Sequence, residues 1–164
     1  MGSEMCIRDR VLSQAAAHRD MAGMATTLSV LILKGQRYVM AHVGDTRIYR
    51  LRNKVLEQLS NDHVWDRPDM RHVLKRAVGL DNTLTVDFAE GMLKVGDVFA
   101  IMSDGAWEPL SEQAIHHGMM LFDSPQLMSE HLTKAALEKG GQDNATALIA
   151  VSYTHLTLPT KRIV

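Results

Sequence analysis

The sequence predicts a layered α+β fold in which two antiparallel sheets pack together and helices flank them. Short segments rich in β-branched and aliphatic residues follow one another over residues 26–59 without a helix between them, as in antiparallel hairpins. Helical patterns with one apolar face are concentrated in the later part of the chain. The regular alternation of strand and helix that a doubly wound parallel sheet requires does not occur.

Seven segments are predicted as strands. In chain order they are residues 26–33, 37–42, 47–52, 55–59, 84–88, 98–102 and 145–151. Short turns at residues 34–36 and 53–54 predict two hairpins, and we expect the first four strands to form one meander. Segment 98–102 is apolar at every position, which indicates a strand buried on both faces.

Three segments are predicted as helices, by apolar residues at spacings of three and four and by residues that favour helix ends. They are residues 69–78, between Pro68 and Gly79; a short helix that Ser111 caps and that ends before Gly118; and a helix that begins at Ser124 and Pro125 and ends at Gly140.

The composition excludes several classes of protein. The chain has 164 residues, of which 46% are apolar and 23% charged, as in one globular domain. Eighteen basic and nineteen acidic residues give no uniform field, so we expect neither nucleic acid nor a membrane as partner. No apolar run reaches the roughly 20 residues of a spanning helix. The single cysteine, Cys6, excludes an internal disulfide and favours a reducing, cytoplasmic location.

Three aspartates occupy the same kind of position, at the polar end of an apolar strand beside a small or polar residue. They are Asp45, Asp104 and Asp143. Two ionised acids ~4 Å apart repel by about 4 kcal/mol at an effective dielectric near 20, so carboxylates brought together there would need a cation such as Mg²⁺ or Mn²⁺. Aspartate beside glycine or asparagine also favours turns. The pattern alone leaves both interpretations open.

Six short motifs occur in a fixed order. They are GMATT (23–27), AHVGDTRIY (41–49), DH (62–63), RHVL (71–74), SDG (103–105) and GQDNAT (141–146). Together they resemble the bacterial PP2C-type (PPM) metal-dependent serine/threonine protein phosphatases. The resemblance implies an α-β-β-α sandwich of two antiparallel sheets flanked by helices. It also implies hydrolysis of phosphoserine and phosphothreonine in proteins by a water activated at a binuclear Mn²⁺ or Mg²⁺ centre.

The same resemblance assigns roles to individual residues. It implies that Asp104 and Asp143 are metal ligands of the binuclear centre and that Asp45 helps to hold a third ion. It places His72 in a flap segment beside the substrate cleft, as the substrate-binding residue and the one candidate catalytic side chain. The implied partners are a phosphorylated protein substrate and a cognate or fused serine/threonine protein kinase.

The sequence also departs from the family pattern. The family carries an Arg-x-x-Asn-x-Asp and an Asp-Gly-x-Gly-Gly segment upstream, which supply a phosphate-binding arginine and the aspartate that bridges the metals, and neither occurs here. We therefore expect a partial domain at residues 11–151, incomplete at its N-terminus, with a poor metal site and little activity. Residues 1–10 and 152–164 resemble translated sequencing-adapter sequence and are expected to be non-native tails. The alternative is a non-catalytic PP2C-like regulatory or protein-binding module.

Two further expectations concern structure. Asp62 and His63 are interpreted as a hydrogen-bonding pair at the base of the flap, and Arg47 and Tyr49 as sheet packing and charge compensation. The strands at 26–33 and 145–151 would pack beside missing upstream elements, so they should lie at unpaired sheet edges and favour association.

Overall fold

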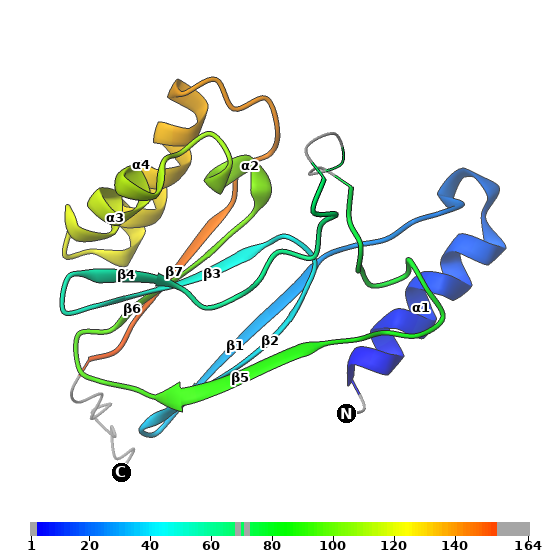
Figure 1. Cartoon of the computed structure of the whole chain (residues 1–164), viewed down its shortest axis with the longest axis horizontal. Coiled ribbons are helices and arrows are strands. Elements are labelled where there is room, and N and C mark those ends of the chain that lie inside the picture. The colour runs from blue at the N-terminus through cyan, green and yellow to red at the C-terminus, as the bar shows by residue number, and fades with distance from the viewer. Residues whose placement is uncertain (1–2, 68–69, 71–72, 154–164) are drawn as a thin grey trace, which may run out of the picture.

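A computed structural model describes residues 3–67, 70 and 73–153, and it contains two antiparallel sheets (Figure 1). One sheet has the order β1-β2-β5, formed by β1 (Leu28–Lys34), β2 (Arg37–Val43) and β5 (Asp87–Met92). The other has the order β4-β3-β6-β7, formed by β3 (Arg47–Arg52), β4 (Val55–Gln58), β6 (Val98–Met102) and β7 (Ala147–Val151). The predicted α+β fold with two antiparallel sheets is confirmed.

The predicted meander of four strands is wrong. Both hairpins form, and Asn53 and Lys54 take the positive φ angles of a type I′ turn. The chain nevertheless passes from one sheet to the other at Gly44, whose φ is +115°. A Cβ there would lie 2.4 Å from Cγ2 of Thr27, so only glycine fits this crossover. Hairpin patterns in a sequence do not specify which hairpins share a sheet.

Two helices cover one face of the four-stranded sheet. α3 (Glu112–Met120) and α4 (Pro125–Glu138) lie side by side there (Figure 1). Ser111 caps α3 by accepting a hydrogen bond from the Ala114 amide at 3.2 Å, as predicted. The predicted end of this helix before Gly118 is wrong. A Cβ at Gly118 would lie 2.7 Å from Cδ2 of Leu132, so this glycine allows the close approach of α4.

Three shorter or peripheral elements complete the described chain. They are α1 (Ser3–Ala17), the 3₁₀ helix η1 (Arg19–Met21) and α2 (Asp104–Trp107). α1 lies at the end of the molecule away from α3 and α4 (Figure 1). Its Ile7 closes one side of an apolar groove on the outer face of the three-stranded sheet.

The helix predicted over residues 69–78 is wrong for the described residues 70 and 73–78. Leu74 instead forms an isolated β-bridge with Val64, and Val78 forms one with Thr26. Val78 is fully buried, and its backbone pairs with that of Thr26 at 2.8 and 2.9 Å, so this part of the chain forms its hydrogen bonds with a distant segment and not within a helix. The strand predicted at residues 84–88 is displaced along the chain and forms as β5.

The core has two layers, with β6 between them. Phe99 of β6 faces the three-stranded sheet, where its ring centroid lies 5.3 Å from that of Tyr38. Ala100 and Met102 of β6 face the helices and belong to the larger cluster. The prediction that this strand is buried on both faces is confirmed. That cluster consists of Tyr49, Leu51, Val98, Ala100, Met102, Ala106, Leu110, Ile115, Met119, Met128, Leu132 and Ala136.

The edge positions agree with expectation. β1 ends one sheet and β7 ends the other.

None of the helices in the part of the chain that the structure describes is both long enough and apolar enough to cross a bilayer.

Candidate functional site

Two of the predicted aspartates, Asp45 and Asp104, lie close enough for the charge of Asp104 to act on Asp45. Asp45 lies in the crossover between β2 and β3, and Asp104 is the first residue of α2; both are half-buried. Burial raises the pKa of Asp45, and the negative charge of Asp104 raises it further, with smaller contributions from Asp62 and Glu108. Carboxylates gathered in this way favour a cation between them.

The loop that carries Asp143 packs against the start of α2. Ser103 donates a hydrogen bond through its amide to the carbonyl of Thr146 at 3.0 Å, and its hydroxyl accepts one from the Thr146 amide at 3.0 Å. A Cβ on Gly105 would lie 3.2 Å from the carbonyl carbon of Asp143. The Asp143 side chain is exposed and accepts a hydrogen bond from the Asn144 amide at 2.6 Å. Glycine at position 105 therefore permits the two aspartate-bearing loops to meet.

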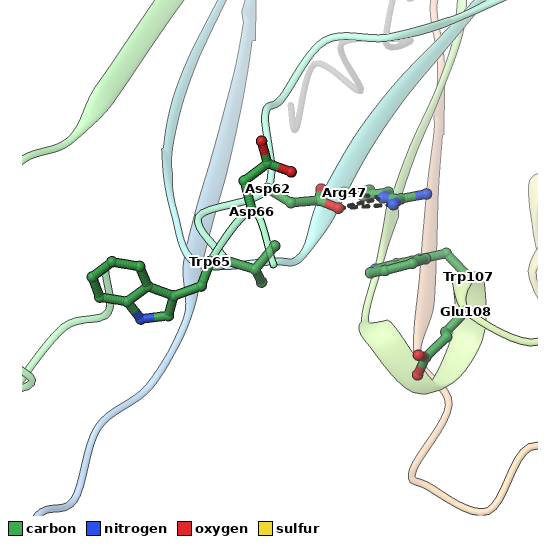
Figure 2. Close-up of a pocket in the computed structure, with 7 residues that line it drawn as sticks. Arg47, Asp62, Trp65, Asp66, Trp107 and Glu108 are labelled. Atoms are coloured by element: carbon green, nitrogen blue, oxygen red, sulfur yellow. Dashed lines mark hydrogen bonds and ion pairs between the residues drawn. The ribbon is translucent and has the colours of Figure 1, made fainter. Parts of the chain in front are cut away.

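A cavity of about 460 Å³ is lined in part by Trp107 and Glu108, which follow Asp104 in the chain; Figure 2 shows its lining residues. It lies between α2 and the loop that follows β4, and it is lined by Arg47, Asp62, Val64, Trp65, Asp66, Trp107 and Glu108. The Arg47 guanidinium lies 3.4 Å from the centroid of the Trp107 ring and pairs with Asp62 at 2.7 Å. The Trp107 indole donates a hydrogen bond to the Asp45 carbonyl at 3.0 Å. Trp107 thus connects the wall of the cavity to the crossover that carries Asp45.

The donor set fits a divalent cation in part. No basic side chain in the described segments forms an ion pair with Asp45, Asp104 or Asp143. Carboxylate oxygens without a cationic partner are the ligands that Mg²⁺ and Mn²⁺ prefer. Within residues 3–67, 70 and 73–153, however, no group of three or more His, Cys, Asp or Glu side chains is arranged to hold a metal ion. The chain therefore supplies part of a coordination shell.

The other sequence-based site assignments have different outcomes. His72 lies outside the described residues. Asp62 and His63 do not pair with each other, so that interpretation is wrong: Asp62 binds Arg47, whereas His63 binds Asp87 at 3.0 Å. Adjacent residues on an extended chain point in opposite directions, which explains the divergence.

Sequence reasoning missed several residues around the site. The sequence pattern gives Trp107 no role, and it indicates only packing and charge compensation for Arg47. Trp107 lies one helical turn after Asp104, and a tryptophan close to a polar site needs an acceptor for its indole N–H; this is the signal for the contact with Asp45. No signal in the sequence indicates that Asp87 approaches His63, because the two meet only through tertiary packing.

Comparisons with known proteins agree with this architecture. The family model described as Protein phosphatase 2C matches residues 4–140. The serine/threonine phosphatase Stp of Listeria monocytogenes is 30% identical in an alignment of 162 positions that covers 87% of this chain and 63% of that protein. PstP of Mycobacterium tuberculosis is 26% identical over 156 residues, which cover 85% of this chain and 30% of that protein. The chain thus spans less than two thirds of the length of these relatives.

Solved structures of bacterial proteins have the same fold as this chain. PppA, a regulatory component of the type VI secretion system in Pseudomonas aeruginosa, has a TM-score of 0.83 at 29% identity, covering 89% of this chain and 65% of that one. The catalytic domain of PstP in complex with two manganese ions has a TM-score of 0.82 at 26% identity, covering 90% of this chain and 67% of that one. Because the family model matches most of the sequence and the fold agrees, the chain belongs to the protein phosphatase 2C family.

Proposed function

We propose that the protein to which this chain belongs hydrolyses phosphoserine and phosphothreonine in proteins at a divalent-metal centre. The observation that carries the proposal is the half-buried pair of Asp45 and Asp104, which has no cationic partner among the described residues. Its burial and mutual repulsion favour occupancy by a divalent ion. Membership of the protein phosphatase 2C family and the two manganese ions of the PstP complex support the assignment.

In this proposal each aspartate has a distinct role. Asp104 and Asp143 supply carboxylate ligands to a binuclear centre, and Asp45 helps to hold a further ion, either Mn²⁺ or Mg²⁺. With a divalent ion held by these carboxylates, the site would lower the pKa of a water molecule and would stabilise the negative charge of the phosphoryl oxygens. The chain's own contribution is orientation: Trp107 fixes the Asp45 backbone, and the Ser103 hydrogen bonds fix the relative position of the loops that carry Asp104 and Asp143. His72 remains proposed as a substrate-binding residue.

The isolated chain is expected to have little activity. The described residues contain no complete three-ligand group, and the family's bridging aspartate has no counterpart in the sequence. That incomplete shell is also the observation that favours the alternative of a non-catalytic regulatory or protein-binding module. A cognate or fused kinase and a cytoplasmic location are further proposals, the second of them based on the single cysteine.

The test compares this chain with a longer product of the same gene, in which native sequence stands in place of residues 1–10. We expect the longer protein to hydrolyse an aryl phosphate and a phosphothreonine peptide only with Mn²⁺ or Mg²⁺, and Asp104→Asn to lower the rate about a hundredfold or more. Asp123→Asn, which changes an exposed aspartate in the loop before α4, is the matched control and should leave the rate unchanged.

Two results would contradict the proposal. One is an upstream sequence without an acidic residue that could bridge two ions, which would favour the non-catalytic module. The other is a folded longer protein that hydrolyses neither substrate with either metal.

A further inference from the structure

A row of polar side chains, with two buried histidines, crosses the inner face of the three-stranded sheet. Ser29 of β1 lies opposite His42 of β2, and His42 lies opposite Asp87 of β5. His63, from the loop after β4, packs on this row with its ring centroid 4.9 Å from that of His42. His42 is 0% exposed and His63 is 3% exposed. The proposed phosphatase chemistry uses none of these side chains.

Two hydrogen bonds join His63 to the residue that precedes Asp45. The His63 amide donates to the Gly44 carbonyl at 2.8 Å, and the Gly44 amide donates to Nδ1 of the His63 ring at 3.1 Å. Because Nδ1 accepts a hydrogen bond, the ring proton belongs on Nε2. Nε2 lies 3.0 Å from Oδ2 of Asp87, which accepts that proton's hydrogen bond. The carboxylate therefore holds the imidazole in the tautomer that Gly44 requires.

The crossover is fixed from its other side as well. The Asp45 carbonyl accepts the hydrogen bond from Trp107, and Thr46 forms a 3.0 Å hydroxyl contact with Thr27. With Gly44 held by His63, the backbone on both sides of Asp45 has a defined position. A fixed backbone limits the directions in which the short aspartate side chain can point.

Asp87 binds two residues that lie 13 positions apart in the chain, His63 and Arg76. Arg76 donates to Oδ1 of Asp87 at 2.8 Å, while His63 binds Oδ2. The Lys75 amide also donates to the His63 carbonyl at 2.7 Å. The position of His63 is therefore fixed by Asp87 of β5 through its ring and by the Lys75 amide through its carbonyl.

We propose that His63 is a positioning residue that directs the Asp45 carboxylate toward Asp104 by holding Gly44, and that Asp87 maintains its imidazole in the Nε2-protonated form. The value of this arrangement for metal binding rests on the proposed function. The hydrogen-bonding role itself is independent of it. A role in core packing alone would depend on the volume of the ring and not on its nitrogen acceptor.

Three variants of the chain separate these possibilities. His63→Leu fills space but offers no acceptor to Gly44. His63→Asn places an amide oxygen close to the position of Nδ1, which keeps an acceptor for Gly44 while losing the contact with Asp87. Ser29→Ala is the matched control, because it removes a hydrogen bond at 2.8 Å to His42 in the same row without touching Gly44.

Amide hydrogen exchange measured by NMR is the primary measurement. In His63→Leu we expect exchange at Gly44 to accelerate about tenfold or more, while exchange at Leu132 in α4 stays within about twofold of the unsubstituted chain. His63→Asn and Ser29→Ala should keep Gly44 exchange within about threefold. Titration with Mn²⁺ then follows paramagnetic broadening of the Asp45 amide, and His63→Leu should require about threefold or more Mn²⁺ for the same broadening.

The proposal is overturned if His63→Leu leaves Gly44 exchange unchanged, or if His63→Asn exchanges as fast as His63→Leu. Should His63→Leu not fold, ¹⁵N spectra of the unsubstituted chain decide: a His63 ring protonated on Nδ1 overturns the proposal, and one protonated on Nε2 supports it. If Mn²⁺ fails to broaden the Asp45 amide in the unsubstituted chain, the claim that this chain alone holds a cation at Asp45 is refuted, while Gly44 exchange still tests the positioning role.

Discussion

At the scale of single residues, the site depends on side chains that fix the backbone beside an acid. Trp107 shows this most directly, because its indole N–H reaches the Asp45 carbonyl while its ring lies against Arg47. Arg47 in turn is neutralised by Asp62 at 2.7 Å. The interaction of a cation with an aromatic face and the hydrogen bond at the ring edge therefore act on one side chain.

Replacing Trp107 by phenylalanine should weaken this arrangement. We expect Trp107→Phe to lower the free energy of unfolding by about 1–2 kcal/mol, because it removes the hydrogen bond to Asp45 and reduces the stacking surface for Arg47. Urea denaturation followed by circular dichroism measures the change. Trp65→Phe is the control: Trp65 is 44% exposed and should change the free energy by less than about 0.5 kcal/mol. Equal effects of the two substitutions would contradict this account.

A second residue-scale prediction concerns Asp97, which is 1% exposed and ion-paired with Arg52 at 2.6 Å. Burial alone would raise the pKa of Asp97, but hydrogen bonds from Arg52 and the Lys94 amide outweigh it and lower the pKa below 3.8. The stability that this pair contributes is thus present in full above pH 3.8 and is lost as the pH falls through the lowered folded value. Asp97→Asn should cost about 3 kcal/mol at neutral pH and should flatten the acid limb of the stability curve.

The control for this prediction is an exposed ion pair. Glu138→Gln removes a contact with Lys134 at 3.8 Å on the surface of α4 and should cost less than about 0.5 kcal/mol. Urea denaturation between pH 3 and pH 7 provides the comparison. An unchanged acid limb in Asp97→Asn would show that other carboxylates dominate the loss of stability.

At the scale of elements, the two ends of the molecule differ in how firmly their helices are attached. α4 places Met128, Leu132 and Ala136 in the main cluster. α1 instead contributes Ile7, which is 41% exposed, and a hydrogen bond from Arg8 to the Asn82 carbonyl at 3.0 Å. Hydrophobic stabilisation follows the area removed from water, so α4 contributes far more to stability than α1.

Removing residues 1–10 tests the prediction that the domain spans residues 11–151. The free energy of unfolding should fall by less than about 1 kcal/mol, because the deleted residues remove little apolar area from water. A thermal melt of the two chains at equal concentration measures the effect. Loss of the cooperative transition on deletion would show that the first ten residues are part of the folded unit.

At the scale of the whole molecule, the three-stranded sheet has an outer face with little cover. Five apolar residues on that outer face are more than a third exposed: Val30, Ile32, Val39, Phe88 and Met92. β1 is also an edge strand, and its free backbone groups can pair with another strand. An apolar face next to an open edge favours association between chains.

We therefore expect this chain to self-associate at micromolar concentration or to unfold readily. Ile32→Lys, on the 55% exposed position of β1, should shift the sedimentation profile toward monomer because a charge opposes edge pairing and burial. Leu137→Lys, at a 59% exposed position of α4, is the control and should leave the profile unchanged. A monodisperse monomer with a cooperative melt would contradict the expectation.

The sequence by itself determined most of the local structure. Six of the seven strands and the Ser111 cap follow from periodicity and turn residues, because these signals depend on near neighbours in the chain. It failed for the described residues 70 and 73–78 of the predicted helix, where Leu74 and Val78 form β-bridges with Val64 and Thr26 instead. Tertiary pairing overrode the local preference there.

Only the tertiary structure decided which chemical groups meet. The sequence singled out Asp45, Asp104 and Asp143 one at a time, but the electrostatic coupling of Asp45 to Asp104 depends on how two sheets and a short helix pack. The contact between His63 and Asp87 likewise joins residues 24 positions apart through the burial of a sheet face. Periodicity reports which face of an element is apolar, whereas a site arises from the relative placement of several elements, which no local pattern encodes.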